Sequence, residues 1–100
     1  MAVKLLMTWD VLPGKEQEHF EFMVRDFIPG MQRLELEPTD AWYTLYGNQP
    51  QIMTSAQMRS LGDLNRVLES QEWKDLTRMM LDYVKDFEYK IVSARTGFQI

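Results

Sequence analysis

The predicted β-strands of this chain are apolar on both faces, and this feature restricts the folds that it can adopt. Residues 2–10 alternate as a strand does, and one side of that strand consists of Val3, Leu5, Met7 and Trp9. The other side still carries Leu6. A sheet face that meets water is normally polar, so both faces of this sheet are expected to be covered.

The order of the segments predicts a ferredoxin-like α+β fold. The expected strands are 2–10, 40–47, 51–58 and 88–98, the long helices are about 15–34 and 70–87, and a short helix covers 60–70. Ser60 and Ser70 are suited to begin the second and third helices as capping residues. This β-α-β-β-(α)-α-β order is typical of a four-stranded antiparallel sheet with helices on one side. A single domain over residues 1–100 is expected.

The first long helix has an apolar stripe and one internal irregularity. The stripe consists of Phe20, Met23, Val24, Phe27, Met31 and Leu34. Pro29 and Gly30 fall inside the helix, so we expect a kink there or an end near Ile28. His19 lies at the edge of the stripe and is expected in solvent or at a subunit border. Phe22 points further from the stripe and is expected to be exposed or in an interface.

A second copy of the chain is the simplest cover for the face that the helices leave free. Covering ~600 Å² of apolar surface per subunit would contribute ~15 kcal/mol before the cost of association. We therefore expect a homodimer that packs sheet against sheet. The C-terminal residues Phe98 and Ile100 either reach a neighbouring subunit or fold back on their own domain.

Composition excludes several classes of function. The net charge of −4, with charges interspersed, argues against a nucleic-acid partner. The absence of cysteine excludes disulfides and thiolate chemistry, and one histidine without cysteine cannot build a common zinc or iron site in one chain. No segment has the length of a membrane span or the apolar core of a signal peptide. A cytoplasmic protein without a metal or other cofactor is expected.

Several segments together resemble the dimeric α/β-barrel superfamily. They are Pro13-Gly14-Lys15 before a helix, "IPGMQRLEL", "VLESQEWKDL" and "YVKDFEYKIV". Within that superfamily the chain is similar to antibiotic-biosynthesis-monooxygenase-like and NIPSNAP-like domains. The resemblance implies a homodimeric barrel, and it leaves activity open because the superfamily includes oxygenases, decarboxylases, isomerases and haem-degrading enzymes. The haem-degrading members use a histidine on the later long helix, where this chain has none.

Two functions therefore remain open at this stage. The first is a dimer that binds a small apolar or aromatic molecule or serves a structural role. The second is a cofactor-independent monooxygenase for an aromatic or polyketide-like substrate, with an isomerase or decarboxylase as a further possibility. The residues that we consider as pocket candidates are His19, Tyr43, Trp73, Tyr83 and Arg95.

Overall fold

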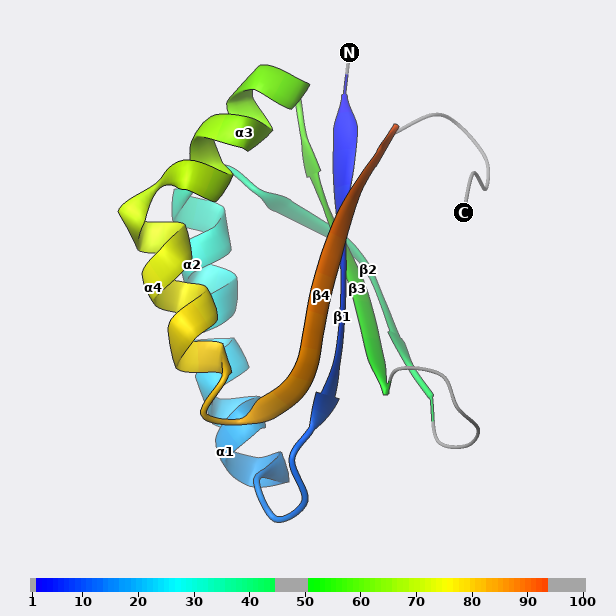
Figure 1. Ribbon diagram of the computed structural model, residues 1–100, viewed down its shortest axis with the longest axis vertical. Helices are drawn as coiled ribbons and strands as arrows, with labels where there is room; N and C mark the ends of the chain where they lie inside the picture. Colours follow the sequence, from blue (N-terminus) through cyan, green and yellow to red (C-terminus); the bar gives the residue numbers. More distant parts are fainter. Residues whose placement is uncertain (1, 45–50, 94–100) are drawn as a thin grey trace.

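The protein forms one layer of helices packed against one face of an antiparallel sheet (Figure 1). The computed structural model describes residues 2–44 and 51–93. The strands are β1 (Val3–Val11), β2 (Glu37–Tyr43), β3 (Ile52–Met58) and β4 (Val84–Ser93). The helical segments are α1 (Glu16–Phe22), a π-helical turn (Met23–Phe27), α2 (Ile28–Arg33), α3 (Leu61–Glu69) and α4 (Gln71–Met80). The predicted ferredoxin-like order is confirmed.

The sheet has the strand order β2-β3-β1-β4, so β1 and β3 are central and β2 and β4 form the edges. All three pairings are antiparallel, and Leu5 lies opposite Ala56 on one side and Ile91 on the other. Because paired residues share a face, the register divides the sheet cleanly. We call the side that carries Leu5, Met7 and Trp9 the helix face, and the opposite side the open face.

The core lies between the helix face and the helices. Leu5, Met7 and Trp9 are fully buried there, and Phe27 and Met80 close over them from the helical layer. The alternation predicted for the first strand is therefore confirmed. The predicted hairpin of the second and third strands is confirmed as an antiparallel pair, although its turn lies outside the described residues.

The π-helical turn corrects the predicted phase of the first long helix. The stripe is right for Phe27 and Met31, which are buried, but Phe20 and Val24 are 63% and 57% exposed. The buried residues of α1 are instead His19 and Phe22. A π turn holds one more residue than an α turn, so it rotates everything before it by about 100° relative to a regular helix. The expectations of a solvated His19 and an exposed Phe22 were wrong for this reason.

The irregularity predicted near Pro29 is present, and it precedes the proline. Pro29 lies in the first turn of α2 and has no N–H to donate to the preceding helical turn. The π turn ends two residues earlier, at Phe27. Gly30 allows α2 to approach α4 closely, because a Cβ at this position would lie 2.4 Å from Cδ1 of Leu76.

The last helix is shorter than predicted. It ends at Met80, and the segment from Val84 onwards belongs to β4 rather than to a helix reaching residue 87. Val84 and Phe87 still pack on the core, so their apolar spacing suited a strand as well as a helix. The backbone N–H of Leu12 donates to the carbonyl of Tyr83 and joins this connection to the end of β1. Both predicted caps are confirmed, because Ser60 and Ser70 accept from the N–H groups of Asp63 and Trp73.

Candidate functional site

His19 is buried and hydrogen-bonded to the central strand β1. Its side chain is 8% exposed, and its Nε2 accepts a hydrogen bond from Nε1 of Trp9 at 3.1 Å. The indole N–H is only a donor, so the histidine ring is neutral and carries its proton on Nδ1. Burial lowers the pKa of His19 from its ordinary value of 6.5, because the charged ring loses its hydration. This histidine is therefore a hydrogen-bond acceptor inside the core.

Three of the predicted pocket candidates meet in one aromatic cluster. Trp9 links His19 to Phe27, with ring centroids 6.1 and 6.3 Å away. Phe27 in turn contacts Trp73, with ring centroids 6.1 Å apart. These side chains pack against one another between the helices and the helix face, and none of them lines a hollow described below.

Tyr83 joins the same cluster through Phe22. It stacks on Phe22 with ring centroids 5.1 Å apart, and Phe22 contacts Phe27 at 6.0 Å. The sequence therefore identified side chains that do come together. Their role in the structure is packing, which is the commoner role of buried aromatic residues.

Tyr43 occupies a different place, on the edge strand β2. It is exposed, and its hydroxyl accepts a hydrogen bond from Nε2 of Gln51 at 3.0 Å. Gln51 is itself fixed, since its Oε1 accepts from the N–H of Val11 and its N–H donates to Asp10, both at 2.8 Å. The remaining candidate, Arg95, lies outside the described residues.

The open face carries a hollow of about 250 Å³. Its lining comes from three strands and consists of Leu6, Thr8, Met53, Glu88, Tyr89 and Lys90. Leu6 and Met53 give it an apolar floor near the middle of the sheet, while Glu88 and Lys90 place opposite charges at its side. Small-molecule sites have this combination of apolar floor and few polar groups, although their volume is usually ~300 Å³ or more.

The open face is more polar than the sequence pattern suggested. Its apolar residues Leu6, Trp42 and Met53 share it with Lys4 and Asp40, whose charged groups lie 3.8 Å apart. Trp42 is 41% exposed on β2. Such a face offers apolar area for association together with charges of both signs.

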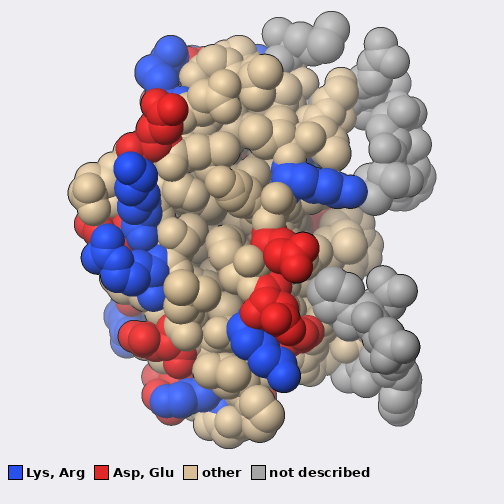
Figure 2. Space-filling view, viewed as in Figure 1, with Lys and Arg blue, Asp and Glu red and all other residues tan. Residues whose placement is uncertain are grey.

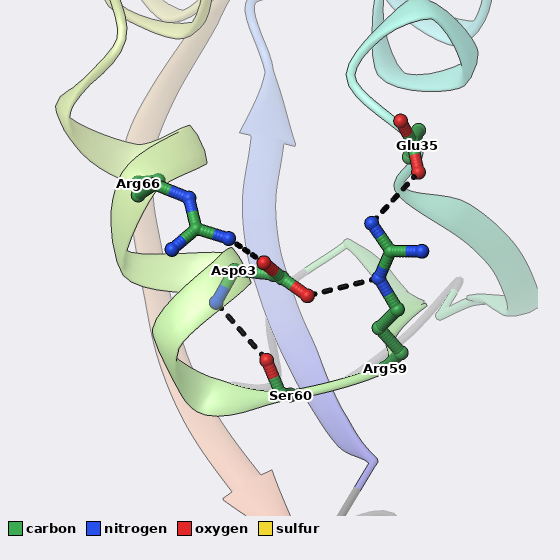
Figure 3. Close-up of polar contacts among 5 residues, drawn as sticks. All are labelled: Glu35, Arg59, Ser60, Asp63 and Arg66. Atoms are coloured by element: carbon green, nitrogen blue, oxygen red, sulfur yellow. Dashed lines mark hydrogen bonds and ion pairs between the residues drawn. The ribbon is translucent and has the colours of Figure 1, made fainter.

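A second hollow, of about 210 Å³, is bordered by a network of charged side chains (Figure 3). Asp63 pairs with Arg66 and with Arg59, and the Arg59 Nε lies 2.9 Å from the Asp63 carboxylate. Arg59 also pairs with Glu35 at 3.4 Å. The two arginines are thus matched by two carboxylates, and the network joins the start of α3 to the turn before β2. This balance favours a structural role over the binding of an anion.

The remaining surface of the described residues offers no concentrated charge of one sign in the view of Figure 2, where basic and acidic side chains are interspersed over the helices. Among residues 2–44 and 51–93, no three histidine, aspartate or glutamate side chains are grouped as metal ligands would be. None of the described helices combines the length and apolar character that crossing a bilayer requires.

Sequence reasoning missed the residues of the open-face hollow. Leu6, Thr8 and Met53 come from two central strands whose pairing register is not visible in the sequence alone. The alternation within 2–10 did place Leu6 and Thr8 on the side opposite Trp9. The missing information was which of the two sides the helices would cover.

No family model and no curated protein matches the chain. Solved structures do match its fold over nearly its whole length. A NIPSNAP family protein from Agrobacterium tumefaciens is 15% identical with a TM-score of 0.72, covering 100% of this chain and 99% of that one. An ethyl tert-butyl ether d (ethd) family protein from Bacillus halodurans is 14% identical with a TM-score of 0.72, covering 95% and 100%.

A third similar structure is described as dimeric. It is a protein of ferredoxin-like fold from Bacteroides fragilis, 8% identical with a TM-score of 0.59, covering 92% of this chain and 95% of its own. At these identities the similarity concerns the fold. The resemblance to NIPSNAP-like domains that the sequence suggested is confirmed at that level.

Proposed function

We propose that the protein binds a small apolar or aromatic molecule in the open-face hollow, and that a second copy of the chain covers this hollow. The observation that carries the proposal is the hollow itself, with its apolar floor of Leu6 and Met53 in the middle of a face that the helices do not cover. Polar groups at its side, including Thr8 and Lys90, would orient a bound molecule.

The size of the hollow supports a dimeric site over a monomeric one. At about 250 Å³ it is smaller than most ligand pockets, and two such hollows facing each other would enclose about twice that volume. The charges of the open face also suit a two-fold arrangement. Because Glu88 and Lys90 lie beside the hollow, a two-fold axis can bring each residue of one copy near its opposite charge on the other.

The monooxygenase alternative has less support. Its pocket would be lined by Trp73, Tyr43 and Tyr83, with His19 or Arg95 handling charge. Trp73, Tyr83 and His19 pack in the aromatic cluster, whereas Tyr43 is exposed on β2 and Arg95 lies outside the described residues. An oxygen electrode with a panel of hydroquinones tests this alternative directly. Steady oxygen consumption that requires the protein would replace the binding proposal with an enzymatic one.

The binding proposal is tested by two measurements on the same protein. Light scattering during gel filtration gives the mass in solution, and fluorescence titration with anilinonaphthalene sulfonate probes an apolar site for an aromatic anion. We expect a dimer that binds the probe. Met53→Glu should weaken probe binding at least about tenfold and shift the mass towards the monomer, because it buries an unpaired charge.

A matched control comes from the opposite side of the molecule. Val24 is 57% exposed in the π turn of the helical layer, and Val24→Glu places the same charge away from the open face. We expect this variant to keep both the dimer and the affinity for the probe. If the protein binds the probe as a monomer, the second copy is not part of the site. If both variants lose the same affinity for the probe, the probe does not bind in the open-face hollow.

A further inference from the structure

The attachment of α1 to the sheet depends on very few side chains. All seven residues of α1 are described, and two of them, His19 and Phe22, are buried. The helix also lies between two irregular points of the backbone. Gly14 has a φ of 84° in the turn before it, and the π-helical turn Met23–Phe27 follows directly. Segments with few buried contacts open at a lower free energy than the rest of a fold.

One of the two attachments depends on the protonation state of a ring. The hydrogen bond from Nε1 of Trp9 to Nε2 of His19 requires a lone pair on Nε2. A second proton on the ring would occupy that nitrogen, and two N–H groups would then face each other in the core. Neither donor would have an acceptor, and unpaired buried donors are costly.

Among residues 2–44 and 51–93, no ion pair or side-chain hydrogen bond joins a charged group to His19. On its own helix, Lys15 and Glu18 pair with each other at 3.6 Å and remain largely exposed. On β1 the carboxylate next to Trp9 is that of Asp10, which accepts from the N–H of Gln51.

From the π turn and β4, the described ring contacts of the pair are with phenylalanine side chains. Trp9 contacts Phe27 of the π turn and Phe87 of β4, at centroid distances of 6.3 and 5.9 Å. The charged neighbour Glu88 on β4 lines the hollow of the open face. No ion pair among residues 2–44 and 51–93 includes His19.

We propose that α1 is a proton-sensitive element: protonation of His19 breaks its hydrogen bond to Trp9 and releases α1 from the sheet. The movement involves residues 15–22, with Gly14 and the π turn as the points where the backbone bends. This inference is independent of the proposed ligand site, because it depends only on the helix face of the sheet.

The direction of the pH dependence follows from burial. The pKa of His19 is lowered in the folded protein, so the unfolded or opened segment binds the proton more tightly. The attachment of α1 is therefore at full strength above the ordinary pKa of 6.5 and weakens as the pH falls below it. One proton allows a change of at most about tenfold in the opening equilibrium per pH unit.

Hydrogen exchange measured by mass spectrometry on the full chain tests this inference. Exchange is compared at about pH 7.5 and about pH 5 and corrected for the intrinsic rate, with α3 as the internal reference since it contains no histidine. We expect protection of α1 to fall towards acid relative to α3. The variant His19→Gln supplies an amide oxygen for the indole N–H and does not titrate, so its α1 should be insensitive to pH.

Two results would overturn the inference. The first is that protection of α1 in the unaltered protein changes with pH no more than protection of α3. The second is that α1 of His19→Gln loses as much protection towards acid as α1 of the unaltered protein. If that variant does not fold, the ring ¹⁵N shifts of His19 in the unaltered protein decide. A neutral Nδ1–H ring that becomes protonated together with α1 opening supports the proposal, whereas an Nε2–H ring or protonation without opening refutes it.

Discussion

The two faces of the sheet have different roles: the helix face carries the core, and the open face carries an accessible hollow. On the helix face, Leu5, Met7 and Trp9 are fully buried under the helices. On the open face, Leu6 of the same strand is also buried, at 4% exposed, but Lys4 and Thr8 are partly exposed and a hollow borders Leu6 and Thr8. The comparison teaches that one strand serves both purposes, because alternation sends every second side chain to each face. Substitutions on the helix face should lower stability, and those on the open face should change association.

The largest change in stability is expected from a comparison of two tryptophans, one on each face. Trp9→Ala removes a fully buried side chain from the core and should destabilise the protein by about 3–5 kcal/mol. Trp42→Ala removes a half-buried side chain from the open face and should cost less than half as much. Denaturant unfolding at low protein concentration measures both, and equal losses would contradict the distinction between the faces.

The second test concerns the helices that cover the helix face. Gly30→Val would place a Cβ where the Leu76 side chain lies and force that side chain to move, at a cost of about 1–3 kcal/mol. Gly62→Ala is the matched control, because nothing lies within 4 Å of its added Cβ. Thermal unfolding should show a lower midpoint for the first variant and an unchanged or higher one for the second. A tolerated valine at position 30 would mean that the Leu76 side chain can be displaced without loss.

A smaller effect is expected at the start of α4. The hydroxyl of Ser70 accepts from the N–H of Trp73 at 3.2 Å, so Ser70→Ala should cost about 1 kcal/mol. Ser70→Asp preserves an acceptor and should restore most of the loss in the free energy of unfolding. If both variants were equally unstable, the contribution of Ser70 would come from the hydrogen bond that its hydroxyl donates to the carbonyl of Val67 at 2.6 Å, which aspartate cannot make.

The smallest expected effect lies on the open face. Lys4 and Asp40 form a partly exposed pair at 3.8 Å, and such pairs contribute about 0.5 kcal/mol or less. Lys4→Met should therefore leave the unfolding free energy of the isolated chain nearly unchanged. The dimer dissociation constant of Lys4→Met is the more sensitive measurement. If a second copy covers the open face, the Lys4–Asp40 pair loses its contact with water and contributes more to the stability of the dimer. Insensitivity of both quantities would place Lys4 outside the interface.

The sequence allowed the order of the elements, the alternation of β1 and both serine caps to be predicted, because each depends on residues close together in the chain. The phase of the first helix could not be predicted in the same way. Phe20 and Phe22 are both apolar, so either can belong to the buried stripe, and the choice depends on the turn that follows. The five-residue step from Phe22 to Phe27 is the spacing of a π turn and was the available signal.

The candidate site was harder to predict because the residues that line it are brought together by strand pairing. Met53 reaches Leu6 and Thr8 only through the register of β1 and β3, which no local pattern encodes. His19, Trp73 and Tyr83 were predicted as pocket candidates, and the structure places them in one aromatic cluster. Aromatic type alone could not distinguish a packed cluster from a lined cavity.

The π turn has a consequence for comparing this chain with others of the same fold. A relative with a regular helix at this place would have one residue fewer between the positions equivalent to Phe22 and Phe27. A correct alignment would then need a one-residue gap inside a helix, where gaps are normally disfavoured. Without that gap, Phe20 would be matched with buried positions of the relative, and the histidine that contacts the sheet would be matched with a position in solvent.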